Sequence, residues 1–408
     1  MKKVYAIIFA LGVAPLAFAG GSQVNLQGQK QQAMGHVATA FTQGAENLFF
    51  NPGSISFLSE KTMISFGVNG IASGVVFQPN NEAQQYRTKP GVSTPFNIYA
   101  THKINDRFAA GIGVYIPFGS TVEWEDEWKG RYILQKVELR TINIQPTLSY
   151  KISDKVGIGV GGIIGFGSVV LEKDIPVSDN SGDRAYVSLE GDDVSYGFNL
   201  GLYYEVSDKL SLGFDYRSQM TYEVEGGDAN FYRPNALADN FPANNKFDAS
   251  LPLPSTTSFG FAYKSSDKLS FGADVNIVGW SVYENLAIDF KKNTASLEDT
   301  DDTKDYSNTF ILRAGAEYKV CEKYTHRVGV YFDKTPVSDR YFGPETPDMN
   351  KIGFSTGFSH KVGERGSLDF SYVLLTGAER EVENIETGFE GRVKAIGHIP
   401  GIGFSYNF

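Results

Sequence analysis

Cysteine, histidine and long apolar runs are scarce in this sequence of 408 residues. The single cysteine, Cys321, excludes an intrachain disulfide and stands at a predicted turn, where it has no evident chemistry. The five histidines lack the spacing of metal ligands, and no Ser/His/Asp arrangement can be recognised. We therefore expect no metal, no cofactor and no enzyme activity. The acidic balance, a net charge of −10, argues against nucleic acid as a partner.

The first nineteen residues have the pattern of a secretory signal peptide. Lys2 and Lys3 precede an apolar run from Val4 to about Ala14, and Ala17-Phe18-Ala19 fits a cleavage site. The apolar run is too short to span a bilayer, and no later run is long enough either. We predict that residues 1–19 are removed and that a Gram-negative bacterium exports the rest.

Long runs of alternating apolar and polar residues follow. The chain contains 44 Gly, 30 Phe and 22 Tyr, a composition typical of membrane strands with aromatic girdles. Phe198, Leu200 and Leu202, for example, alternate with Asn199 and Gly201. Successive side chains of a strand point to opposite faces, so such a run has one apolar face. The runs exceed the roughly 9–11 residues that a tilted strand needs to cross a membrane. They favour a membrane β-barrel over a soluble β-sandwich.

Short turns of similar sequence alternate with long polar links. The clearest turns are 104–108, 152–156, 206–210 and 265–269. Short turns on one side and long loops on the other are typical of outer-membrane barrels, whose short turns lie in the periplasm. We predict an all-β, antiparallel barrel of about 14 strands, with both termini in the periplasm. The strands are expected at about 62–75, 92–104, 107–122, 131–152, 155–172, 192–206, 210–225, 252–264, 268–290, 305–320, 324–334, 350–361, 367–378 and 391–408.

The segment 20–59 does not alternate like a strand. Its apolar residues recur at helical spacing and predict a short amphipathic helix or helix pair; they are Met34, Val37, Ala38, Phe41, Ala45 and Leu48. Pro52 stops a helix and biases Asn51 toward extended backbone, while Gly53 permits a turn that a side chain would resist. We predict an N-terminal hatch that plugs the lumen of a barrel formed by residues 60–408. A disordered periplasmic tail is the alternative.

The third predicted strand contains Ile116-Pro117-Phe118-Gly119. Proline removes a donor from the strand ladder, and a neighbouring glycine weakens pairing, so a bulge or a defect in the wall is expected there. The defect would serve a lateral exit or be a bulge without a role.

Charged residues recur on the predicted lumen-facing side of the strands. They are Asp215 and Arg217, Asp274 and Asn276, Arg313 and Glu317, and Arg327 and Asp333. Arg217, Arg313 and Arg327 are the candidates to contact a charged head group of a ligand. The alternative is that these residues are paired charges that fill the interior.

Two long polar links contain unusual residues. The link at about 226–251 carries Phe231, Tyr232, Leu237 and Phe241, which would capture a greasy ligand or pack against a neighbouring loop. The link around 298–302 is acidic and would hold divalent cations or simply be solvated.

Several motifs resemble the FadL family of long-chain fatty acid and hydrocarbon transporters. Asn51-Pro52-Gly53 is similar to the Asn-Pro-Ala motif that ends the family's hatch, although Gly53 replaces the alanine. Ser22 stands where the family's type member has a pocket phenylalanine. Further similar segments are Gly20–Asn25, Met34-Gly35-His36, Tyr216-Arg217-Ser218 and Phe332–Val337.

The resemblance implies a mechanism for the barrel. A ligand would be caught among the long loops and pass to an apolar pocket near Gly20 and Ser22. The hatch around Asn51, Pro52 and Gly53 would rearrange, and the ligand would leave sideways into the membrane past Pro117, Phe118 and Gly119 in the kinked third strand.

The leading hypothesis is passive uptake of hydrophobic molecules, with long-chain fatty acids first. Aromatic or alkane hydrocarbons are the alternative ligands. A general porin and an adhesin are alternatives of a different class, and an outer-membrane lipase would need a catalytic set that cannot be found. The expected partners are a hydrophobic small-molecule ligand, outer-membrane lipid and lipopolysaccharide, and the barrel-assembly machinery. We expect a monomer.

Overall fold

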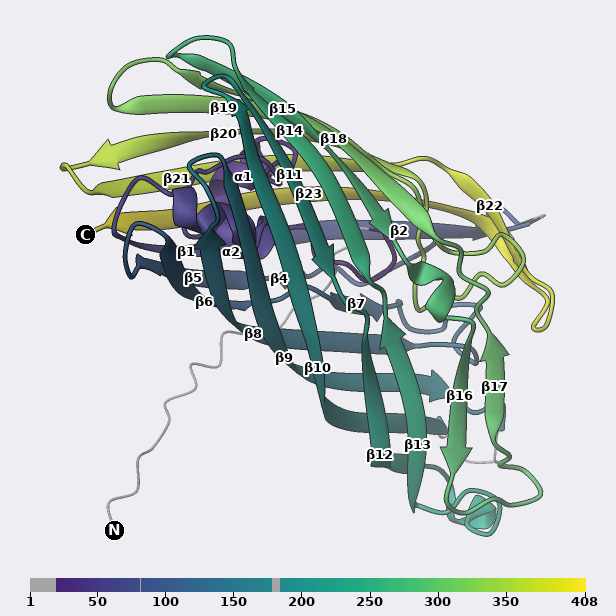
Figure 1. The fold of residues 1–408 in the computed structure, drawn as a ribbon. Coiled ribbons are helices and arrows are strands. Elements are labelled where there is room, and N and C mark those ends of the chain that lie inside the picture. The colour runs from purple at the N-terminus through teal and green to yellow at the C-terminus, as the bar shows by residue number, and fades with distance from the viewer. Residues whose placement is uncertain (1–19, 81, 178–183) are drawn as a thin grey trace.

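The structure is a computed structural model that describes residues 20–80, 82–177 and 184–408. A closed antiparallel β-barrel of 14 strands forms most of it (Figure 1). The expected signal peptide, residues 1–19, lies outside the described residues. Within the described residues, every helix is too short or too polar to cross a membrane.

Several of the fourteen membrane-crossing strands are interrupted, so each consists of one to three labelled segments. In chain order they are β1–β2 (Thr62–Asn69, Ile71–Pro79), β3–β5 (Tyr86–Arg87, Val92–Ser93, Phe96–Lys103), β6–β7 (Phe108–Tyr115, Gly119–Glu123), β8 (Lys136–Lys151), β9 (Val156–Asp174), β10 (Tyr186–Ser207), β11–β12 (Leu210–Arg217, Met220–Tyr232), β13–β14 (Asn244–Leu253, Thr256–Lys264), β15–β16 (Leu269–Val278, Asn285–Phe290), β17–β18 (Thr300–Thr303, Thr309–Lys319), β19 (Tyr324–Asp333), β20 (Lys351–Val362), β21–β22 (Gly366–Gly377, Arg380–Asn384) and β23 (Phe389–Asn407).

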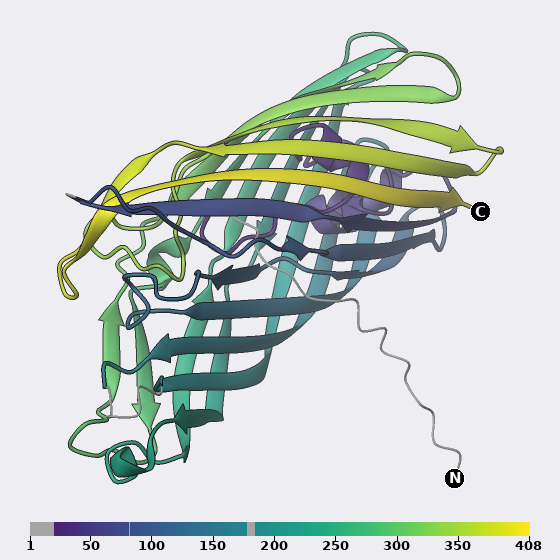
Figure 2. The same cartoon turned by 180° about the vertical axis from the view of Figure 1, so that it is seen from behind.

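The barrel closes because β1 pairs with both β5 and β23. Phe66 lies opposite Ile98 on one side and opposite Phe404 on the other. The predicted fold class and strand count are confirmed. The C-terminus lies at the same end as the short turns (Figure 2).

Alternation along each strand separates a lipid-facing side from a lumen-facing side. In β10, Phe198, Leu200 and Leu202 are each more than 40% exposed, whereas Asn199 is fully buried. An exposed apolar row beside a buried polar row is the inverse of a soluble protein and fits a wall that faces lipid outside.

Some boundaries differ from the prediction at the long-loop end. The link expected at 226–251 is mostly a hairpin, because β12 runs to Tyr232 and β13 begins at Asn244. Likewise, β10 begins at Tyr186 rather than at about 192. Charged residues such as Glu190 and Asp228 still pair through their backbones there, since a strand that has left the membrane no longer needs an apolar face.

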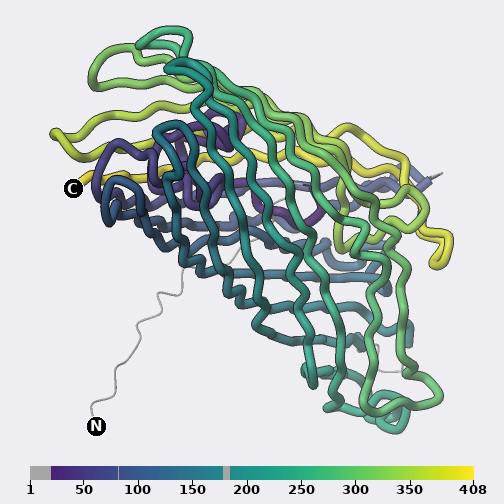
Figure 3. Tube along the Cα trace, viewed as in Figure 1, coloured from purple at the N-terminus to yellow at the C-terminus, as the bar shows by residue number. Residues whose placement is uncertain are grey.

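The N-terminal segment lies inside the ring of strands (Figure 3). It contains α1 (Gln29–Ala33), α2 (Asn47–Phe50) and the 3₁₀ helix η1 (Pro52–Phe57). The predicted helix through Met34 and Phe41 is wrong, because residues 34–46 form turns and irregular backbone between the short helices α1 and α2. Met34 and Leu48 are nevertheless fully buried. A segment enclosed by a barrel buries side chains in every direction, so helical spacing is no guide to helix position there.

Asn51-Pro52-Gly53 packs against a patch of the wall that lacks side chains. The Asn51 Nδ2 donates to the carbonyls of Thr39 (2.8 Å) and Leu202 (3.0 Å), and the Asn51 backbone is extended as predicted. A Cβ on Gly53 would lie 2.8 Å from the Gly157 carbonyl oxygen and 2.9 Å from that of Gly201. Gly53 therefore permits close packing on β9 and β10, rather than the turn that the sequence suggested.

We expect Gly53→Val to displace the segment 20–58 while the barrel still closes. The added side chain meets backbone atoms that cannot give way, and overpacking of this kind costs about 1–3 kcal/mol. Sugar flux into proteoliposomes should rise, with the heat-modifiable folded band on gels retained. The matched control is Gly162→Val, whose Cβ would meet nothing within 4 Å. Equal flux in both variants would contradict the prediction.

Candidate functional site

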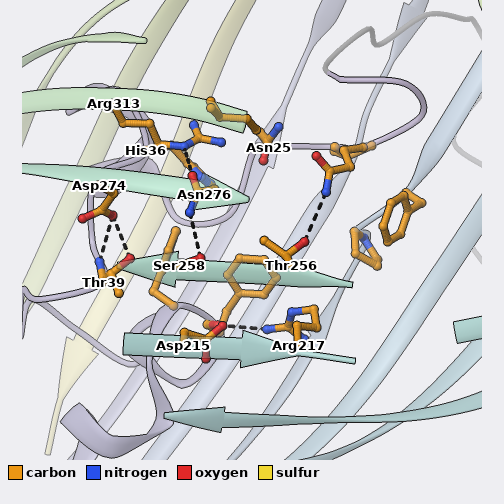
Figure 4. A pocket seen from close by; sticks show the side chains of 17 residues that line it. Asn25, His36, Thr39, Asp215, Arg217, Thr256, Ser258, Asp274, Asn276 and Arg313 are labelled. Carbon is orange, nitrogen blue, oxygen red and sulfur yellow. Dashed lines mark hydrogen bonds between the residues drawn. The ribbon is translucent and has the colours of Figure 1, made fainter. Parts of the chain in front are cut away.

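A small cavity lies between the N-terminal segment and the inner wall of the barrel (Figure 4). Its volume is about 70 Å³, roughly what two water molecules occupy in the liquid. The lining residues are Gln23, Val24, Asn25, His36, Thr39, Phe49, Phe50, Pro117, Phe118, Asp215, Arg217, Thr256, Ser258, Asp274, Asn276, Ile311 and Arg313. Aromatic and charged side chains thus meet beside the interrupted third strand.

Arg217 links the wall to the N-terminal segment. Its guanidinium donates to the Tyr115 hydroxyl (2.6 Å), to Gln145 Oε1 (3.0 Å) and to the Phe49 carbonyl (2.9 Å). It also lies over the Phe49 ring, 4.4 Å from the centroid. None of the described carboxylates forms a salt bridge with it within 4.0 Å, so its charge is held by neutral acceptors and an aromatic face.

Arg313 and Asp274 lie opposite each other on β18 and β15. Arg313 donates to Asn276 Oδ1 (2.6 Å) and to the Gly35 carbonyl (3.3 Å), again without a described salt bridge. Asp274 Oδ2 accepts from the backbone N–H groups of Ala38 (2.9 Å) and Thr39 (3.0 Å), as Figure 4 indicates for Thr39. The two strands thereby hold the chain between α1 and α2 against the wall.

His36 faces the same cavity from the N-terminal segment. The Gln27 backbone N–H donates to its Nε2 (3.0 Å), so that nitrogen carries no proton. Burial lowers the pKa of His36 well below its ordinary value, and the positive charge of Arg313 lowers it further. The imidazole is therefore neutral at pH 7.

The third strand is broken between Tyr115 and Gly119, as the proline predicted. Among the described strands, β7 pairs in a ladder with β8 alone, and its other edge has a gap at Gly119 although Lys89 N–H reaches the Glu123 carbonyl (2.7 Å) at its far end. The N-terminal residues fill it: Val24 N–H donates to the Pro117 carbonyl (2.8 Å), and Gly119 N–H donates to the Ser22 carbonyl (2.9 Å).

Thr141 completes the pairing at the break. Its Oγ1 accepts from Phe118 N–H (3.1 Å) and donates to the Phe118 carbonyl (2.7 Å). Pro117 and Phe118 are buried. The break is thus closed by hydrogen bonds to the N-terminal segment on one side and to Thr141 of β8 on the other.

The first residues of the segment are anchored by side chains of the wall and the long-loop end. Gly20 N–H donates to Asp333 Oδ2 (2.7 Å), and Gly21 N–H donates to Asp348 Oδ2 (3.1 Å). The Gly20 carbonyl accepts from Trp280 Nε1 (3.0 Å). Gly20 and Ser22, both predicted near the pocket, therefore flank the segment Gln23–Asn25 that lines the cavity.

The other predicted ligand contacts lie elsewhere. Arg327 does not line the cavity and instead binds Glu317 (2.6 Å) and Ser359. Phe231 and Phe241 stack on each other with centroids 5.8 Å apart, and Leu237 packs against the same loop cluster. Tyr232 stacks on Tyr186 (4.5 Å) and remains half exposed. These loop residues pack as the alternative interpretation expected.

Several lining residues had no signal in the sequence. Phe49 and Phe50 stand directly before the Asn51 motif, but their direction depends on α2. Gln23 forms an isolated β-bridge with Phe118, and Val24 and Asn25 follow it without a sequence pattern that predicts their position.

The chain belongs to the family described as outer membrane protein transport protein (OMPP1/FadL/TodX), whose model matches residues 10–408. A long-chain fatty acid transport protein of Escherichia coli O6:H1 is 23% identical, covering 100% of this chain and 98% of its own. The crystal structure of a Pseudomonas aeruginosa FadL homologue has a TM-score of 0.85 at 21% identity, over 95% of this chain and 100% of that one. The Ralstonia pickettii toluene transporter TbuX has a TM-score of 0.71 at 17% identity, over 93% and 98%. The protein is thus an outer-membrane transporter of hydrophobic substrates.

We expect His36 to weaken the packed N-terminal segment at low pH. Since the folded pKa lies below the unfolded value near 6.5, protonation favours the released segment, and stability is lost as pH falls through about 6.5. His36→Gln keeps an acceptor for Gln27 and removes the titration. The measurement is sugar leakage from proteoliposomes at pH 7 and at pH 5.5. The increase in leakage between the two pH values should be larger for the wild type than for the variant. An identical pH response in both proteins would contradict this account.

Proposed function

We propose that the protein carries long-chain fatty acids across the outer membrane, with the carboxylate held near Arg217 and Arg313. The observation that carries the proposal is the presence of two buried arginines at one cavity, neither with a described carboxylate partner. A guanidinium has five N–H donors, and the described hydrogen bonds use three on Arg217 and two on Arg313. Donors therefore remain for a carboxylate.

Other polar atoms at the cavity support an amphipathic ligand. Gln23 Oε1, Asn25 Nδ2 and Asp274 Oδ1 are buried and have no hydrogen-bond partner among the described protein atoms. Buried polar atoms are normally paired, and an apolar ligand would leave them unpaired. Phe49, Phe50 and Phe118 favour the second candidate, an aromatic hydrocarbon, since they offer ring contacts without a charge.

A volume of about 70 Å³ is far below the roughly 300–1,000 Å³ of ordinary ligand sites. Binding therefore requires the N-terminal segment to move. Under this proposal the segment is a hatch, and the state described here is closed.

The proposed exit is the break in the third strand. Pro117 and Phe118 line both the cavity and the gap in the ladder. Displacement of residues 22–24 would uncover that gap at membrane height, a path that suits a ligand that prefers lipid.

Replacing the arginines separates the two ligand classes. Arg217→Gln and Arg313→Gln should each weaken oleate binding about 10- to 100-fold, the worth of a charged hydrogen bond. Toluene binding should change less than threefold. Arg327→Gln is the matched control, because Arg327 lies outside the cavity. Equal losses of affinity for oleate and toluene would indicate that the arginines stabilise the fold rather than bind the carboxylate.

Restoring the ladder tests the lateral exit. We replace Ile116-Pro117-Phe118-Gly119 by Val-Thr-Val-Thr, which supplies the missing donor and favours strand pairing with the neighbouring strand. Oleate uptake into cells should fall at least tenfold, while oleate binding to the purified barrel stays within threefold. Unchanged oleate uptake by the folded variant would contradict a lateral exit and indicate exit through the periplasmic mouth of the barrel.

A further inference from the structure

Gly20 is the first residue of the predicted mature chain, and it is buried in the structure. Removal of the leader hydrolyses the Ala19–Gly20 peptide bond, so that one water molecule gives a carboxylate on Ala19 and an α-ammonium group on Gly20. The amide nitrogen before cleavage has one N–H donor and no charge, whereas the ammonium has three donors and a positive charge. An α-amino group has an ordinary pKa of about 7.7–8.0 and is therefore mostly charged at pH 7. The surroundings of this nitrogen show whether they suit a buried cation.

Asp333 is the acceptor at this nitrogen. It is the last residue of β19, is fully buried and accepts the Gly20 N–H at Oδ2 (2.7 Å). Its other oxygen, Oδ1, has no hydrogen-bond partner within the part of the chain that the structure describes. That oxygen lies 2.9 Å from the position that a Cβ on Gly20 would occupy. A buried carboxylate oxygen without a donor is costly, and an α-ammonium group on Gly20 offers further donors beside it.

Two aspartates share one lysine at contact distance here. Asp348 is fully buried, accepts the Gly21 N–H (3.1 Å) and forms an ion pair with Lys351. Lys351 lies opposite Asp333 in the strand register, but its ammonium contacts Asp348. Arg313 of the neighbouring strand β18 makes its described hydrogen bonds to an amide oxygen and a backbone carbonyl. No described Lys or Arg lies within 4.0 Å of the Asp333 carboxylate, so a cation at the chain end supplies the charge that this carboxylate lacks.

The site also fits a chain end without side chains. The Gly20 carbonyl accepts from Trp280 Nε1 (3.0 Å), so both backbone groups of Gly20 are held. A Cβ on Gly21 would lie 2.5 Å from the Trp280 ring, and the φ of Gly21, +72°, is strained for a residue with a side chain. The two glycines therefore let the chain end approach both the carboxylates and the indole.

We propose that Asp333 and Asp348 form the binding site for the α-ammonium group that leader cleavage creates at Gly20. Cleavage then anchors the start of the N-terminal segment in the lumen, because it creates the charge and the donors that Asp333 lacks. A chain that keeps its leader has neither. This anchor is independent of which hydrophobic ligand the protein carries.

The reactivity of the amine measures the ion pair directly. The mass of the exported protein first establishes whether its chain begins at Gly20. The folded protein is then treated at pH 7 with an acetylating reagent, and the modified N-terminal peptide is quantified by mass spectrometry. The Gly20 amine of the folded wild type should react at least about tenfold more slowly than that of the unfolded chain, since a charged hydrogen bond is worth about 10- to 100-fold. Asp333→Asn should remove most of this protection.

Asp369→Asn is the matched control. Asp369 is also buried and also binds the N-terminal segment, but at Lys30 (3.7 Å) instead of Gly20. The Gly20 amine of this variant should react within about threefold of the wild-type rate, with heat-modifiability confirming that each barrel is folded. An unprotected amine in the folded wild type, or a mature chain that begins at another residue, would overturn the proposal. Equal deprotection in both variants would also overturn it, because general loosening of the segment would then explain the reactivity.

Blocking the amine tests whether its charge anchors the segment. The unfolded processed chain is acetylated at pH 6.5, where the α-amine reacts before the lysines, and is then refolded. Hydrogen exchange of the Gly21 and Val24 amides measures anchoring, because Asp348 and Pro117 accept these N–H groups. Acetylation should speed this exchange at least about tenfold in the wild type and less than about threefold in Asp333→Asn, which lacks the charged partner. Equal acceleration in both proteins would indicate that the bulk of the acetyl group is responsible and would overturn the ion pair, as would no acceleration in the wild type.

Discussion

Every backbone donor and acceptor at membrane height needs a partner, because lipid offers none. The barrel meets this constraint by closing β1 onto β23. It departs from the ladder beside the cavity at Pro117, and there Ser22 and Val24 provide the missing partners from inside. Residues 22–24 are therefore tied to the wall at the break, and a movement of these residues leaves backbone groups of Pro117 and Gly119 without their partners.

Close backbone packing also determines how the N-terminal segment fits into the lumen. Gly157, Gly159 and Gly201 leave one patch of the inner surface of β9 and β10 without side chains, and Pro52 and Gly53 lie directly on the backbone there. Alternation in the sequence places Gly201 opposite the apolar face of its strand. It does not show that Gly201 and the glycines of β9 receive Asn51-Pro52-Gly53, because that contact joins segments about 100 to 150 residues apart.

The sequence predicted the barrel well because alternation is a local property with a fixed period. It predicted the site only in part. The alternation shows whether a side chain faces the lumen or the lipid, but not how far along the barrel axis it lies. Arg217, Arg313 and Arg327 all share the lumen-facing parity, yet Glu317 binds Arg327 away from the cavity. The loop aromatics show the same limit: Phe231 and Phe241 are apolar as expected, but a hairpin directs them toward each other.

The cavity and the wall break share the segment at residues 22–24, and this sets the free-energy cost of ligand entry. A molecule larger than about 70 Å³ must displace one side of the cavity. The barrel strands are held by ladders of many backbone hydrogen bonds, whereas residues 22–24 are held at the break by two, worth about 1–3 kcal/mol together. A carboxylate that gains a charged hydrogen bond of about 1.5–3 kcal/mol offsets this loss. A hydrocarbon must offset it by burial alone, at about 25 cal/mol per Å². Displacing these residues frees the Pro117 carbonyl and the Gly119 N–H toward the cavity, where water or the ligand can reach them. Under the proposed function, occupying the cavity and opening the wall are therefore one event.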